Sequence, residues 1–182
     1  MPIYISMLRG INVGGHKLIK MDQLRKSFEA LGFQQVKTYI QSGNVVFKTA
    51  KLSPVTLSKK IEERILRDFG FSAFVISRTA AEMVNAIASN PFLNQPGIDP
   101  QRLHVMFLSA PPAPAALKKL TDLTQAPERS SCLDREIYLY LPNGAGQSSL
   151  MKSPLDRVLS VVTTTRNWNT VNQLARMCEE CR

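Results

Sequence analysis

The residues with the most unusual chemistry lie between Arg9 and Lys17, directly after an apolar run at the start of the chain. They combine cations, an amide, an imidazole and three glycines, namely Arg9, Gly10, Asn12, Gly14, Gly15, His16 and Lys17. Glycine adopts positive φ angles and lets backbone N–H groups approach a ligand. A glycine loop between a strand and a helix N-terminus, flanked by cations, is therefore a candidate site for a phosphate-bearing ligand.

The glycine spacing differs from the known phosphate motifs. A P-loop requires Gly-x4-Gly-Lys-Ser/Thr, and a dinucleotide site requires Gly-x-Gly-x-x-Gly. Here the glycines stand at positions 10, 14 and 15, and no Ser or Thr follows Lys17. The alternative interpretation is an irregular crossing loop whose glycines only make turns. The sequence leaves both interpretations open.

A second segment with candidate ligand-binding side chains contains Gln41, Ser42 and Asn44. It lies between two β-rich segments and is at least a tight turn. In a ferredoxin-like lobe the hairpin between the second and third strands lies at the same sheet end as the loop after the first strand. We therefore expect this turn to border the Arg9 loop.

A third candidate segment near the end of the chain contains Arg166, Asn167 and the only tryptophan, Trp168. An arginine beside a tryptophan is able to stack a base or to clamp a carboxylate or phosphate. The alternative is that Trp168 anchors the last helix in the core and that Arg166 is an ordinary surface charge.

Sets of residues that would define a reaction are missing from the sequence. His16 and His104 are the only histidines, and His104 lies in an apolar strand, where a structural role is simplest. Cys178-x-x-Cys181 has the spacing of half a zinc site, but no second ligand pair accompanies it. We predict no metal and no cofactor, and the sequence assigns no catalytic residue and leaves open whether the protein is an enzyme.

The basic charge of the chain is concentrated in its first third. Residues 1–70 hold 12 Lys and Arg against 5 Asp and Glu, a net charge of +7, and the remaining residues add +2. A basic lobe attracts polyanions such as nucleic acid, although solvated helix faces alone also account for such a charge. No apolar run approaches the roughly 20 residues of a membrane span. The odd count of three cysteines favours a reducing compartment, so we expect a cytoplasmic protein without membrane partners.

Hydrophobic periodicity divides the first half into a strand, a helix, two hairpin strands, a helix and a strand, at residues 3–8, 21–31, 36–41, 45–49, 54–69 and 73–77. Thr79 and Glu82 predict a capping box at the start of a further helix to about residue 88. This order is the ferredoxin-like βαββαβ pattern.

The second half repeats strand, helix, strand and strand at residues 103–108, 115–123, 130–133 and 136–141. Helices follow at 154–162 and 168–177, with a break at Thr163 to Asn167 between them and a cap near Asn169 or Thr170. The fold class is α+β, with two ferredoxin-like subdomains in tandem and a C-terminal helical segment. The domains are residues 1–90 and 103–182, joined by a proline-rich linker at 91–102.

Three stretches together carry a family resemblance. Arg9-Gly10-Ile11-Asn12-Val13-Gly14-Gly15, the run from Val36 to Phe47 and the run from Arg166 to Val171 resemble the domain of unknown function 1697 family. Membership implies a bacterial, cytoplasmic-type α+β fold of two similar subdomains, and no known activity, substrate or cofactor.

Three hypotheses for function follow. The first is binding of a phosphate-bearing ligand, a nucleotide or a nucleic acid, at the loop after the first strand. The sequence lacks the aromatic strand motifs of ferredoxin-like RNA-binding domains, which counts against a nucleic acid. The second is a small-molecule enzyme of unassigned reaction class that uses the same loop. The third is an oligomeric interaction protein, and the oligomeric state is not determined by the sequence.

Overall fold

The computed structural model describes residues 1–181, which divide into two compact units. Unit 1 comprises Met1–Asn85 together with the residues from Gln173 onward, and unit 2 comprises Ala86–Asn172. The described residues form an α+β fold with two four-stranded antiparallel sheets, one in each unit. The unit boundaries therefore fall inside two helices, and the division at residues 91–102 stays a prediction.

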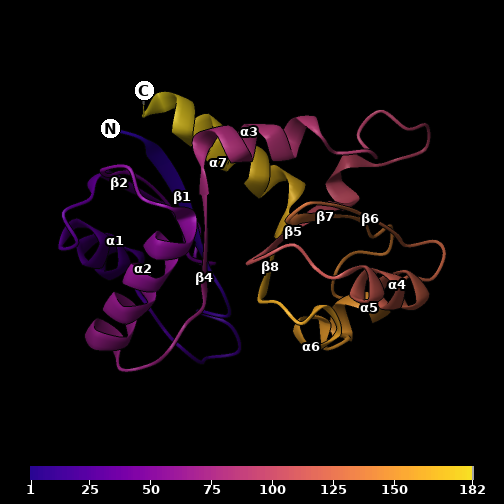
Figure 1. Cartoon of the computed structure of the whole chain (residues 1–182), viewed down its shortest axis with the longest axis horizontal. Coiled ribbons are helices and arrows are strands. Elements are labelled where there is room, and N and C mark those ends of the chain that lie inside the picture. The colour runs from indigo at the N-terminus through magenta and orange to yellow at the C-terminus, as the bar shows by residue number, and fades with distance from the viewer. Residues whose placement is uncertain (182) are drawn as a thin grey trace. The chain divides into compact units, whose positions relative to one another are not determined.

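Unit 1 has the sheet order β2-β3-β1-β4, in which all neighbouring strands are antiparallel. Two helices, α1 and α2, cover one face of this sheet, as Figure 1 shows. The elements in chain order are β1 (Ile3–Leu8), α1 (Met21–Glu29), β2 (Gln34–Tyr39), β3 (Asn44–Lys48), α2 (Pro54–Phe69), β4 (Val75–Thr79) and α3 (Ala80–Ala88), whose end lies in unit 2.

The core of unit 1 forms because apolar side chains alternate along the strands and recur every three or four residues along the helices. Tyr4 and Leu8 of β1 face the helices, and Leu57, Ile61 and Ile65 of α2 pack against them. Phe28, Phe33 and Phe47 add an aromatic cluster, with the Phe33 and Phe47 rings stacked at 4.6 Å. Ser53 caps α2 by accepting a hydrogen bond from the Thr56 N–H, as Pro54 at the first position predicts.

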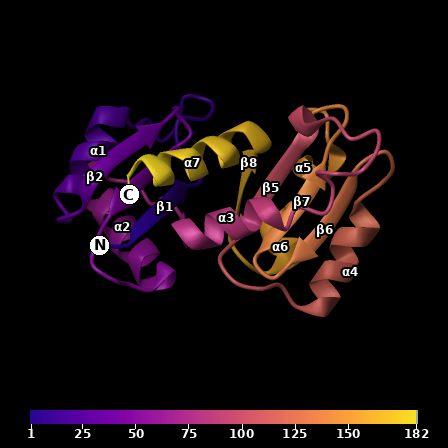
Figure 2. The same ribbon diagram turned by 90° about the horizontal axis from the view of Figure 1, so that it is seen from above.

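Unit 2 has the sheet order β6-β7-β5-β8, again with antiparallel neighbours (Figure 2). Its core joins the sheet to α4, α5 and α6 through a set of buried leucines, Leu108, Leu120, Leu139, Leu150, Leu155 and Leu159. The elements are the 3-10 helix η1 (Pro100–Arg102), β5 (Leu103–Leu108), α4 (Pro114–Leu123), β6 (Arg129–Leu133), β7 (Glu136–Tyr140), α5 (Ser149–Lys152), α6 (Leu155–Leu159), β8 (Thr163–Asn167) and α7 (Trp168–Glu180), whose end lies in unit 1.

The expected break at Thr163 to Asn167 is wrong, because these residues form β8 at the edge of the second sheet. Three consecutive threonines are β-branched and fit a strand, and pairing with β5 decides the conformation in favour of that preference. The cap of the last helix also differs. Asn167 accepts a hydrogen bond from the Thr170 N–H at 2.8 Å, so it is the N-cap in place of Asn169 or Thr170. The helix expected at 154–162 is shorter, at Leu155–Leu159.

The two units share details of backbone register. In unit 1 the Leu8 N–H donates to the Gly43 carbonyl at 2.8 Å, and in unit 2 the Leu108 N–H donates to the Arg135 carbonyl at 2.9 Å. Ile5 is paired with Arg78 across β1 and β4, just as Val105 is paired with Arg166 across β5 and β8. The repeat expected from the order of elements therefore extends to single residues.

Candidate functional site

The loop after β1 is a small hairpin. The Asn12 N–H donates to the Lys17 carbonyl at 3.1 Å, and inside this pair the His16 N–H donates to the Val13 carbonyl at 3.0 Å. Gly14 and Gly15 occupy the tip with φ angles of 59° and 77°, the left-handed conformation that a two-residue hairpin turn requires. Turn formation therefore accounts for these two glycines.

Asn12 fixes this hairpin to its surroundings. Its side-chain Nδ2 donates to the carbonyls of Ile19 and Gln41, both at 2.9 Å, and its Oδ1 accepts from the Ile19 N–H at 2.8 Å. Both amide hydrogens and one lone pair of the side chain are thus used inside the protein. Asn12 is a positioning residue, and the expected role as a ligand contact does not match its bonding.

The turn at Gln41 to Asn44 borders the hairpin, which is the neighbourhood expected from the sequence. Gly43 packs against the hairpin so closely that a Cβ there would lie 2.6 Å from Ile11 Cδ1 and 2.9 Å from Leu8 Cβ. Asn44 is buried, and its Nδ2 donates to the Tyr39 carbonyl at 3.1 Å and to Ser42 Oγ at 2.9 Å. The Gln41 side chain is exposed.

Four basic side chains surround this joined pair of loops, and we call them the basic edge of unit 1: Arg9, His16, Lys17 and Lys20. Arg9 is half-buried, and burial lowers its pKa below the ordinary value. Lys17 Nζ donates to the Ser72 carbonyl at 2.7 Å. Within residues 1–181 neither Lys17 nor Lys20 forms an ion pair, so their charges are not neutralised by a carboxylate of the protein.

The N-terminus of α1 adds to the basic edge. Lys20 is its N-cap residue and makes no side-chain cap hydrogen bond, so the first N–H groups of the helix lack that partner. Asp22 in the first turn opposes an anion there, and its carboxylate lies 3.7 Å from Arg25. The helix end therefore supports anion binding only together with the cations.

The third candidate segment belongs to unit 2 and is held by bonds within that unit. Arg166 is 8% exposed, which contradicts its interpretation as a surface charge. Its Nη1 donates to Thr164 Oγ1 at 2.8 Å and to the Thr165 carbonyl at 2.9 Å, and burial lowers the pKa of Arg166 to about 10. Trp168 is buried as the first residue of α7, which agrees with a core anchor. Arg166 and Trp168 therefore contribute to the packing of unit 2.

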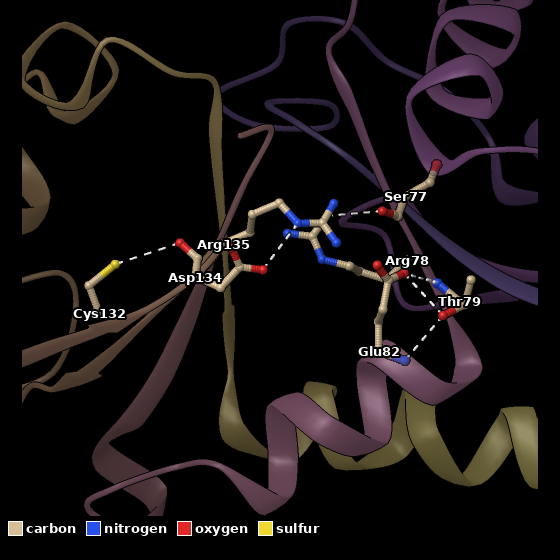
Figure 3. A network of polar contacts seen from close by, with 7 residues as sticks. All are labelled: Ser77, Arg78, Thr79, Glu82, Cys132, Asp134 and Arg135. Carbon is tan, nitrogen blue, oxygen red and sulfur yellow. Dashed lines mark hydrogen bonds and ion pairs between the residues drawn. The ribbon is translucent and has the colours of Figure 1, made fainter. Parts of the chain in front are cut away.

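Arg78 of β4 is the counterpart of Arg166 in unit 1. It is 1% exposed, and its Nη1 donates to the Ser77 carbonyl at 3.0 Å (Figure 3). Each arginine directly precedes the residue that caps the next helix, Thr79 for α3 and Asn167 for α7. Arg78 is not among the residues predicted from the sequence, although the matching order of elements in the two halves could have paired it with Arg166.

A cavity of about 400 Å³ was also missed from the sequence. It lies at the C-terminal half of α2 and the segment that enters β4, and Lys17 of the basic edge lines one side of it. The sequence signal that could have indicated this cavity is Leu66, because it lies outside the apolar α2 face of Leu57, Ile61 and Ile65. In the structure Leu66 is half-exposed.

Within residues 1–181 no three His, Cys, Asp or Glu side chains gather in a way that could hold a metal ion. Cys178 and Cys181 are both buried at the end of α7 and form no disulfide within residues 1–181, so the terminal helix is packed at that point. Among the same residues no helix combines the length and the apolar character needed to cross a bilayer.

The fold and these motifs define an α+β protein of two four-stranded antiparallel sheets, and comparison with known proteins gives its family. A model described as "Protein of unknown function (DUF1697)" matches residues 1–138, so the chain belongs to that family. The structure is also similar to a conserved bacterial protein, SP0830, from Streptococcus pneumoniae, with a TM-score of 0.79 and 22% identity. That match covers 97% of this chain and 98% of the other, and at this identity it establishes the fold alone. No curated protein matches the chain.

Proposed function

We propose that the protein binds an anionic, phosphate-bearing ligand, a nucleotide or a nucleic acid, at the basic edge of unit 1. The observation that carries this proposal is the exposed pair Lys17 and Lys20, which has no ion-pair partner within residues 1–181, on loops that Asn12 holds in place. Because the loops of the basic edge are already ordered, phosphate binding there does not lose the entropy of ordering them.

The charge distribution supports the same proposal. Residues 1–70 carry a net charge of +7, so the long-range field of the chain directs polyanions toward this part. We further propose that each unit is a ferredoxin-like lobe, because the strand orders β2-β3-β1-β4 and β6-β7-β5-β8 with antiparallel neighbours are those of this fold. We place the protein in the cytoplasm of a bacterium, an assignment supported by its three cysteines, none of which forms a disulfide within residues 1–181.

The test is binding of a fluorescently labelled single-stranded oligonucleotide, measured by anisotropy over a series of salt concentrations. For single strands the logarithmic salt slope falls by about 0.7 for each phosphate contact removed. We expect Lys17→Ala with Lys20→Ala to lower the slope by about 1.4, and Lys20→Ala alone, which removes no side-chain hydrogen bond, by about 0.7.

The matched control is Lys118→Ala with Lys119→Ala, which removes two exposed lysines from α4 in unit 2. This variant should keep the slope of the natural protein. Competition with ATP and inorganic pyrophosphate separates the two sources of phosphate, since a nucleotide site is blocked by ATP at low concentration. Equal losses in both double variants, or no binding of any of the three anions at low salt, would contradict the proposal.

A further inference from the structure

The cavity of unit 1 differs in chemistry from the basic edge beside it. It has a volume of about 400 Å³, within the range of roughly 300–1,000 Å³ that is usual for small-molecule sites. Its walls include two glutamates of α2, Glu62 and Glu63, together with the apolar side chains Leu66 and Phe74. The combination of carboxylates with apolar walls favours a ligand that has both a positive charge and an apolar part.

Glu62 is the carboxylate of this cavity that the protein holds in place by a hydrogen bond. Its Oε1 accepts a hydrogen bond from the Val75 N–H at 2.8 Å, which anchors the carboxylate at the start of β4. Within residues 1–181 the other carboxylate oxygen makes no hydrogen bond, and no cation lies within ion-pair distance of Glu62. Burial raises the pKa of Glu62, and the negative charge of Glu63 adds to this shift, whereas the Val75 N–H and the positive charge of Lys59 oppose it.

The apolar walls are unusually open to solvent. Leu66 is 50% exposed and Phe74 is 54% exposed, although both are large hydrophobic residues. On a monomer, scattered exposed hydrophobics need no explanation, but here the two residues line one concavity with a carboxylate. Lys17, the one cation among the described residues that line this cavity, directs its ammonium to the Ser72 carbonyl at 2.7 Å.

We propose that this cavity binds a small organic cation, an amine or amidine that carries an apolar group, with Glu62 as the partner of the charge. The ammonium forms a charge-assisted hydrogen bond with the carboxylate oxygen that the protein leaves unbonded. The apolar group covers Leu66 and Phe74 and removes their surfaces from water. An anion is excluded because Glu62 and Glu63 repel it.

The inference is independent of the proposed function, since it concerns the opposite ligand charge and depends on Glu62 and not on Lys20. The test is a titration of the ¹⁵N-labelled protein with 2-phenylethylamine, followed by the amide NMR signals. We expect the largest shifts at residues 72–75 and at Lys17. The neutral 2-phenylethanol and the anionic 3-phenylpropionate should bind at least tenfold more weakly, because neither carries the positive charge that pairs with the carboxylate.

Three variants make the result specific. Glu62→Gln retains an oxygen for the Val75 N–H and should bind the amine about tenfold more weakly, whereas Glu179→Gln, at an exposed glutamate of α7, should not change the affinity. Phe74→Ser, at a half-exposed position, should weaken the amine and the alcohol alike. Glu62→Gln should also leave oligonucleotide binding intact, which separates this inference from the basic edge.

The inference is overturned if the amine binds no more tightly than the alcohol, or if its shifts lie outside residues 17 and 62–75. It is also overturned if Glu62→Gln, with an otherwise unchanged spectrum, binds the amine as the natural protein does.

Discussion

At the scale of single residues, the loop after β1 divides its polar groups between two tasks. Asn12, Gly14 and Gly15 shape the hairpin, whereas the side chains of His16 and Lys17 are exposed to solvent. The sequence alone could not make this division, because an asparagine in a glycine loop is compatible with both tasks. The side chain of Asn12 donates one of its hydrogen bonds to the Gln41 carbonyl, a partner 29 residues away.

Gly43 provides a direct test of how closely the two loops pack. Gly43 and Gly15 share a φ angle of 77°, but a Cβ at Gly43 meets Ile11 at 2.6 Å, whereas a Cβ at Gly15 meets no atom within 4 Å. We expect Gly15→Ala to lower the free energy of unfolding by about 1 kcal/mol, the cost of left-handed backbone. Gly43→Ala adds an overpacking cost and should lose about 2–4 kcal/mol.

The measurement is urea unfolding of the two variants and the natural protein, with the slope of the transition checked for constancy. The comparison removes the backbone cost common to both positions. Equal losses of unfolding free energy in the two variants would contradict the close contact of Gly43 with Ile11 and Leu8.

At the scale of elements, the junctions from β4 to α3 and from β8 to α7 share one feature: a buried arginine is followed directly by the residue that caps the helix. Thr79 and Glu82 form a capping box, in which the Thr79 N–H donates to Glu82 Oε2 at 2.7 Å and the Glu82 N–H donates to Thr79 Oγ1 at 3.1 Å (Figure 3). The sequence prediction of this box is confirmed. Such a box is readable from sequence because both partners lie within four residues.

Replacing Thr79 by alanine should lower the free energy of unfolding by about 1 kcal/mol, because the Glu82 N–H near the start of α3 loses its side-chain partner. The control is Thr121→Ala in α4, where an exposed hydroxyl donates to the Leu117 carbonyl one turn earlier. This change should be neutral or slightly stabilising, since alanine is the better helix former. Thermal unfolding of both variants measures the difference, and similar losses would argue against the cap.

The elements that the sequence misjudged are those decided by distant partners. The edge strand β8 exists because Thr163 to Asn167 pair with β5, about 60 residues earlier in the chain. Once the strand was expected as a break, Arg166 was expected in a loop, and its burial could not be anticipated. The hairpin from β6 to β7 has local partners across Asp134 and Arg135, and its prediction is confirmed.

At the scale of the whole molecule, sequence patterns predicted the α+β class and the family, since the order of elements and the loop motifs span most of the chain. They also predicted that the Arg9 loop and the turn at Gln41 to Asn44 would be neighbours. The cavity at Glu62 could not be predicted, because its walls come from a helix, a loop and a strand entrance whose spacing depends on packing.

The central claim is that phosphate-bearing ligands bind at the basic edge of unit 1. Addition of inorganic pyrophosphate to the ¹⁵N-labelled protein at low salt tests it most directly, because amide signals report on each position of the chain. We predict that the largest shifts fall at residues 9–20 and 41–44, and that they diminish as salt is added. Shifts centred in residues 86–172, or no saturable shifts at all, would contradict the claim.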